Sequence, residues 1–107
     1  MIDNFNTKSK EKALLIGVIH SVLDEKIVKD HLDELRLLAI TAGAEVVGNI
    51  TQKLSRINPS FFIGTGKAEQ IINQAKELGV SLIIFDDELS PAQVKNFSNL
   101  AKDVKVI

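Results

Sequence analysis

The chain has 107 residues, 45% of them hydrophobic, with 13 lysine and arginine residues against 14 aspartate and glutamate residues. This length fits one domain that buries roughly 65% of the surface of the unfolded chain, and the formal net charge of −1 excludes an overall basic excess of the nucleic-acid-binding kind. The lack of cysteine excludes disulfides, thiolate nucleophiles and cysteine-based zinc sites.

Residues 1–11 are polar, so we expect a flexible tail ahead of a domain that covers residues 12–107. This start lacks the apolar stretch of a secretory signal, and no apolar run approaches the roughly 20 residues that span a bilayer. We therefore expect a cytoplasmic protein without a membrane-spanning segment.

The first predicted elements are a strand and a helix. A continuous apolar run over residues 13–19 predicts a strand covered on both faces. Ser21 or Asp24 is placed to cap the helix that follows, and Gly43 is placed to end it. A second strand is predicted over residues 45–51, joined to the first by a right-handed crossover.

A polar loop is expected over residues 52–60, and a short strand over residues 61–63. After a glycine turn, apolar residues recur at helical spacing, and Gly79 is expected to stop this helix. The next buried strand is predicted over residues 81–85.

A third helix is predicted to begin at Ser90, because Pro91 suits the first helical position and Gln93 completes a capping box. Residues 104–107 are expected to form a last strand, and the abrupt apolar end is typical of a chain trimmed from a longer protein. The alternation of strands and helices predicts a single α/β domain, with a mainly parallel sheet of about four to five strands flanked by helices.

The turn from Gly64 to Lys67 is the first candidate site. The glycines Gly64 and Gly66 permit close backbone approach, and the helix start offers unpaired N–H groups and a lysine charge to an anion. A P-loop would require glycine at Phe61 and a hydroxyl residue at Ala68, so nucleotide hydrolysis is not expected here. Contact with an anion or RNA phosphate and a purely structural role are alternatives of equal weight for this turn.

Three basic residues, Lys53, Arg56 and Lys67, lie in a stretch without acidic residues over residues 46–68. A flexible loop would bring them together as a surface for RNA phosphate. An ordinary solvated loop is the alternative. The neighbouring Phe61 and Phe62 suit core packing better than stacking on bases.

A second candidate site is the acidic run from Asp86 to Glu88, which follows a buried strand. Its carboxylates could hold Mg²⁺, but their place before a helix start is explained by the helix dipole alone. His20 and His31 lack partners at ligand spacing and are expected to be structural, so no metal site is predicted.

Two apolar residues, Leu37 and Ile40, widen the apolar surface of the first helix beyond one face. They indicate contact either with another domain or with more of the sheet.

Three segments in register resemble HflX-family GTPases. They are DELRLLAITAGAEVVGNITQK at residues 33–53, FIGTGKAEQI at residues 62–71 and IIFDDELSPAQVKN at residues 83–96. The resemblance covers residues 12–107 and only the amino-terminal domain of the family. The helical arm and the G domain that follow in the family are absent from this chain.

The resemblance implies a domain that associates with the large ribosomal subunit, its rRNA and ribosomal protein, in a protein that helps to split or rescue stalled ribosomes. It implies no catalytic residue and no cofactor in this chain, with GTP and Mg²⁺ serving the G domain. Two alternatives are adenine-nucleotide (ATP) binding at the glycine turn and regulation of the protein's own G domain.

Carried over to this sequence, the family pattern places Gly64, Gly66 and Lys67 in a glycine-lysine turn and Lys53 and Arg56 in the loop before it. This chain has leucine at position 54, where the family often has a basic residue, and threonine at position 65, where it often has a charged one. Both departures reduce the charge available for RNA.

Overall fold

The computed structural model describes residues 10–20 and 25–107. Most of the predicted polar tail, and both predicted caps Ser21 and Asp24, lie outside these residues. In the described part, strands and helices alternate along the chain: β1 (Lys12–His20), α2 (Glu25–Thr41), β2 (Glu45–Leu54), α3 (Thr65–Leu78), β3 (Leu82–Phe85), α4 (Pro91–Leu100) and β4 (Lys105–Val106).

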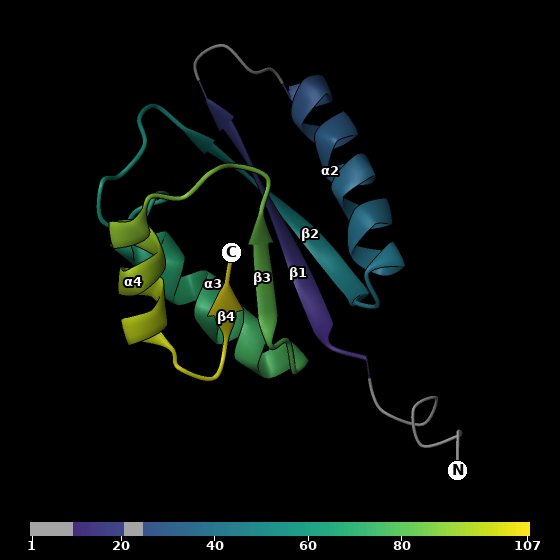
Figure 1. Cartoon of the computed structure of the whole chain (residues 1–107). Coiled ribbons are helices and arrows are strands. Elements are labelled where there is room, and N and C mark those ends of the chain that lie inside the picture. Colours follow the sequence, from purple (N-terminus) through teal and green to yellow (C-terminus); the bar gives the residue numbers. More distant parts are fainter. Residues whose placement is uncertain (1–9, 21–24) are drawn as a thin grey trace.

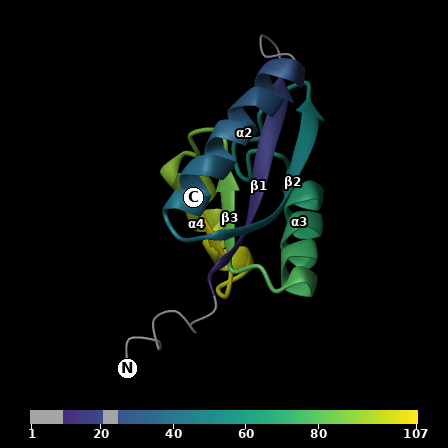
Figure 2. The same ribbon diagram turned by 90° about the vertical axis from the view of Figure 1, so that its right-hand side faces the viewer.

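The described strands form one sheet of four strands in the order β2-β1-β3-β4, and each neighbouring pair is parallel. Helix α2 covers one face of the sheet, and α3 and α4 cover the other (Figures 1 and 2). The predicted single α/β domain with a parallel sheet is confirmed.

The side chains of β1 divide the core into two parts because they alternate between the faces of the sheet. Leu14, Ile16 and Val18 belong to the larger part, which includes the buried faces of α3 and α4. Leu15 faces the other way and packs on Val28 and Leu32 of α2. As an inner strand with side chains in both parts of the core, β1 therefore holds both helical layers to the sheet.

Two predicted helix boundaries are confirmed. Ser90 and Gln93 form the capping box of α4, with both hydrogen bonds present, and Pro91 occupies the first turn. Gly79 ends α3 in the left-handed conformation, with a φ of 71° that favours glycine.

Two predictions after β2 are wrong. Strand β2 continues to Leu54, so residues 52–54 lie in the sheet, where Leu54 pairs with His20 and packs against the core. The strand predicted over residues 61–63 is a tight turn, with an isolated antiparallel bridge between Asn58 and Phe62. Phe62 has a φ of 65°, which an extended strand cannot contain.

No helix within residues 10–20 and 25–107 combines the length and apolar character that crossing a bilayer requires.

Candidate functional site

The carboxyl ends of β1 and β3 lie side by side, and the chain leaves them towards opposite faces of the sheet. From β1 it passes to α2 on one face, and from β3 it passes to α4 on the other (Figure 1). In open α/β sheets such a switch point is the usual place for a ligand. The side chains at this edge therefore define the first region of interest.

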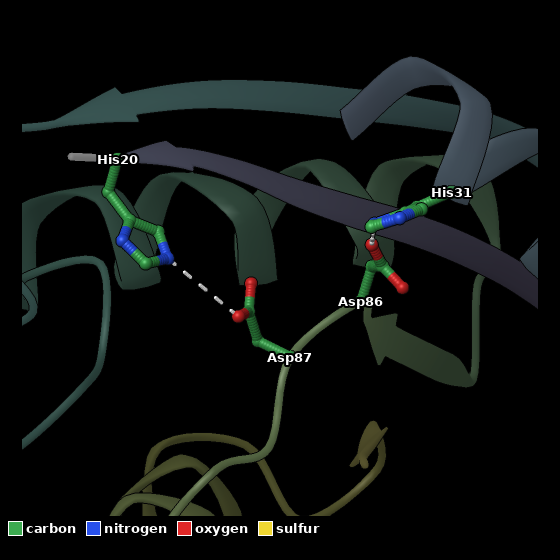
Figure 3. A network of polar contacts seen from close by, with 4 residues as sticks. All are labelled: His20, His31, Asp86 and Asp87. Atoms are coloured by element: carbon green, nitrogen blue, oxygen red, sulfur yellow. Dashed lines mark ion pairs between the residues drawn. The ribbon is translucent and has the colours of Figure 1, made fainter. Parts of the chain in front are cut away.

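Two histidine–aspartate contacts occupy this edge (Figure 3). His31 Nδ1 on α2 lies 3.4 Å from Asp86 Oδ2, and His20 Nε2 at the end of β1 lies 3.9 Å from Asp87 Oδ1. Burial raises the pKa of both aspartates, although the neighbouring histidine opposes the shift in each case. The contacts join the ends of β1 and β3 and the first half of α2.

The sequence did not indicate these contacts, because His20 and His31 have no partner at ligand spacing along the chain. The signal was present in Asp86 and Asp87 at a strand end, but the pairing depends on β3 lying next to β1. Figure 3 shows two separate pairs, and no three histidine, cysteine, aspartate or glutamate side chains of the described residues group as a metal site.

The glycine turn forms the amino-terminal end of α3. Gly64 has a φ of 94°, a conformation that favours glycine, and no side chain caps the helix there. The first N–H groups of α3 therefore have no side-chain acceptor. A shallow cavity of about 460 Å³ adjoins them, lined by Ile63, Gly64, Gly66, Lys67 and Gln70.

The basic residues do not share one face of the sheet. Because Leu54 packs on the core beneath α3 and α4, Lys53 projects on the opposite face, where α2 lies. There the ammonium of Lys29, and to a lesser degree that of Lys53, lowers the pKa of Glu25. Lys67 is exposed on α3, which covers the other face. The structure therefore separates Lys53 from Lys67 by the sheet.

Arg56 lies on the loop between these two residues and is exposed. The loop is held more firmly than its polar sequence predicts, because Gln93 and Asn96 of α4 donate hydrogen bonds to the carbonyls of Asn58 and Ser60. Arg56 is thus carried on a segment tied to α4.

The predicted apolar surface on α2 is present. Leu37 and Ile40 are 66% and 44% exposed, and Leu38 between them is 67% exposed. A cavity of about 290 Å³ lies alongside, lined in part by Ala39, Ile84 and Ile107. Nothing in the described part of the chain covers these side chains.

Together, these features define a small parallel α/β domain with an uncapped helix start, exposed basic side chains and two histidine–aspartate contacts. The family described as "GTP-binding GTPase N-terminal" matches residues 29–107. Curated relatives from several bacteria carry the name GTPase HflX. The chain is 45% identical over 97 residues to the one from Flavobacterium psychrophilum (91% of this chain, 23% of the relative).

It is 41% identical over 100 residues to the relative from Caldanaerobacter subterraneus subsp. tengcongensis (94% of this chain, 22% of the relative). It is 33% identical over 102 residues to the relative from Escherichia coli (95% of this chain, 23% of the relative). The chain belongs to the HflX GTPase family and corresponds to its amino-terminal domain. It spans about a quarter of the length of these relatives.

Proposed function

We propose that this chain is the ribosome-associating amino-terminal domain of an HflX-like GTPase, acting in the cytoplasm. It binds the large ribosomal subunit and helps the whole protein to split or rescue stalled ribosomes. In this proposal the domain extends over residues 12–107, and its contacts to RNA phosphate come from Lys53, Arg56, Lys67 and the helix start at Gly64 and Gly66. GTP and Mg²⁺ act in a G domain outside this chain.

The observation that carries the proposal is the exposed amino-terminal end of α3. Its first N–H groups lack a side-chain cap, Lys67 projects beside them, and Arg56 lies on the loop that leads into them. A helix start attracts phosphate through its N–H groups and its dipole, but this contributes only about 0.3–1 kcal/mol at an exposed end. The cations are therefore needed to raise the affinity.

The residues on either side of the glycine turn do not support catalysis there. Phe61 and Ala68 stand where a P-loop needs glycine and a hydroxyl residue, and both pack into the core. Ala68 is fully buried, so its position offers no room for a magnesium ligand. These packing contacts support a binding role for the chain and GTP hydrolysis elsewhere in the protein.

Co-sedimentation of the chain with large ribosomal subunits tests the proposal. With three phosphate contacts, and with the slope for B-DNA as a guide, a fourfold rise in salt should weaken binding roughly 40-fold. Changing Lys53, Arg56 and Lys67 together to alanine should remove most of this salt dependence. Salt-insensitive binding, or equal binding by this variant, would contradict the proposal.

A matched control changes the same number of exposed basic residues elsewhere. Lys76, Lys102 and Lys105 lie near the amino-terminal edge of the sheet, at the ends of α3 and α4 and in β4. Their joint replacement by alanine alters the net charge equally and should leave most of the binding intact. Since Lys53 and Lys67 lie on opposite faces of the sheet, alanine variants of each residue alone show whether RNA contacts both faces.

A second function is favoured by the exposed apolar surface of Leu37, Leu38 and Ile40. The domain would regulate its own G domain by packing against it, without touching RNA. Changing these residues to serine in the full-length protein should then alter GTP affinity, whereas the lysine and arginine variants should not. ATP binding at the glycine turn is a further alternative, tested by Mg²⁺-dependent binding of ATP to this chain.

A further inference from the structure

Gln93 stands apart because its polar side chain is buried, with 6% of its surface exposed. Its Oε1 accepts a hydrogen bond from the Ser90 backbone N–H at 2.8 Å, which closes the capping box of α4. Its Nε2 donates to the Asn58 carbonyl, also at 2.8 Å. The first bond is local to the helix, whereas the second joins α4 to the loop before α3.

Asn58 organises that loop from within. Its Oδ1 accepts hydrogen bonds from the backbone N–H groups of Ser60, at 2.9 Å, and Phe61, at 2.8 Å. Its backbone exchanges two further bonds with Phe62, each at 2.8 Å. Side-chain bonds of this kind fix a tight turn around Pro59. The Gln93 bond therefore attaches to the residue that determines the shape of the loop.

Further contacts tie the same loop to α4. Asn96 Nδ2 donates to the Ser60 carbonyl at 2.9 Å. The ring of Phe61 meets that of Phe97 edge to face, with centroids 5.4 Å apart. Helix α4 thus holds the loop through polar contacts at Gln93 and Asn96 and an apolar contact at Phe97.

Backbone strain lies immediately after this attachment. Phe62 has a φ of 65° although it is not glycine, and its side chain is buried. Such a conformation persists only where the surroundings enforce it. Two residues later, Gly64 is the N-cap of α3. The contacts of α4 with the loop therefore help to determine where the chain enters this helix.

We propose that Gln93 is a positioning residue for phosphate binding. It holds the loop over residues 55–63 so that Arg56 and the amino-terminal end of α3, with Lys67, face one RNA backbone. This inference rests on the proposed function, because it assigns to α4 the geometry of that same site. Gln93 itself does not contact RNA.

The test compares Gln93→Met with Ser90→Ala in the 107-residue chain. Methionine matches the length of glutamine but removes both the capping bond and the bond to Asn58. Alanine at position 90 removes the hydroxyl that accepts the Gln93 backbone N–H at 3.1 Å and leaves Asn58 untouched. Both variants weaken the capping box, and only Gln93→Met releases the loop.

Hydrogen exchange of individual amides is the first readout. In Gln93→Met, exchange at Ser60 and Phe61 should rise about fivefold, the equivalent of one net hydrogen bond, beyond any change in the core strands. Ser90→Ala should leave these amides unchanged relative to the core. Equal exchange at Ser60 and Phe61 in the two variants would overturn the inference, whatever their binding.

Binding to large ribosomal subunits is the second readout. Gln93→Met should bind about fivefold more weakly than Ser90→Ala, with no change in formal charge. If loop exchange rises but binding is unchanged, the positioning role is wrong. If the variant with Lys53, Arg56 and Lys67 changed also binds normally, the proposed function has failed instead, and the exchange data alone show that Gln93 fixes the loop.

Asn96→Ala provides a milder second variant should Gln93→Met fail to fold. It removes the bond to the Ser60 carbonyl from a position that is only partly buried. Exchange at Ser60 and Phe61 should rise, and binding should weaken, in the same direction as in Gln93→Met. A folded Asn96→Ala variant with native exchange and binding would contradict the proposal.

Discussion

Gly17, in the middle of β1, sets how closely α2 approaches the sheet. A Cβ atom added there would lie 2.7 Å from Val28 Cγ1 and 2.8 Å from Leu32 Cδ1. Both neighbours are buried, with 1% and 2% of their surfaces exposed, so neither side chain can swing into solvent. We therefore predict that Gly17→Ala destabilises the fold by forcing α2 away from β1.

The size of this effect follows from two opposing contributions. Overpacking a close-packed core costs about 1–3 kcal/mol. Replacing glycine by alanine reduces the entropy of the unfolded chain, which stabilises the protein by about 0.4–1 kcal/mol where the backbone allows it. Gly17 is not among the glycines with positive φ, so both apply, and the net loss should be about 1–2 kcal/mol.

The chain supplies a control and a rescue. A Cβ at Gly48 in β2 would have one neighbour, Leu14 Cδ1, at an ordinary contact distance of 3.7 Å. Gly48→Ala should therefore be neutral or slightly stabilising. Val28→Ala removes the methyl group nearest to the new Cβ, so the double variant with Gly17→Ala should lose about 1 kcal/mol less than the sum of its parts.

Urea unfolding followed by far-ultraviolet circular dichroism measures all of these free energies. Thermal unfolding provides a second measure, since 1 kcal/mol corresponds to about 4–8 °C in a domain of this size. If Gly17→Ala and Gly48→Ala have the same stability, or if Val28→Ala adds its full cost to Gly17→Ala, the close approach of α2 does not limit the packing at this position.

Three further predictions concern stability. Burial raises the pKa of Asp86, so the ionised carboxylate destabilises the folded chain at pH values above the raised pKa. The effect is absent at pH values below the ordinary pKa near 3.9. Asp86→Asn should therefore stabilise the chain at pH 8.5, by less than about 1 kcal/mol at this partly exposed site. Below pH values of about 3 the gain should disappear, since the carboxyl is then protonated in both the folded and the unfolded chain, and equal gains in urea unfolding at the two pH values would contradict this. Phe97→Ala should cost about 3–5 kcal/mol in the same assay, because Phe97 is fully buried against other rings; a loss below about 1 kcal/mol would be incompatible with that packing. Ser90→Ala should cost about 1 kcal/mol as an N-cap loss, and an unchanged unfolding midpoint would show that the capping box does not stabilise α4.

Features that depend on neighbouring residues in the chain could be predicted from the sequence. The capping box at Ser90 and Gln93 requires only four consecutive residues, and the glycine end of α3 requires only the conformational freedom of Gly79. The alternation of apolar strands with amphipathic helices likewise indicated the parallel α/β fold, because parallel strands are joined by crossover helices that cover the faces of the sheet.

Features that depend on the order of strands could not be predicted. The contacts of His20 with Asp87 and of His31 with Asp86 exist because β3 pairs with β1, a fact that no local pattern contains. The same holds for Lys53, whose face depends on β2 continuing to Leu54. The turn at Asn58 did carry a local signal, since asparagine before proline favours a side-chain-bonded turn.

The central position of β1 has a consequence for the order of folding. Strand β1 pairs both with β2, the next described strand, and with β3, where Leu14 meets Ile83. We therefore expect the unit of β1, α2 and β2 to assemble early, before α3 and α4 cover Ile16 and Val18. Joining β3 requires closing a long loop, which slows folding. If assembly follows this order, the apolar face that carries Ile16 and Val18 is uncovered until that step, and we expect aggregation to begin from this face.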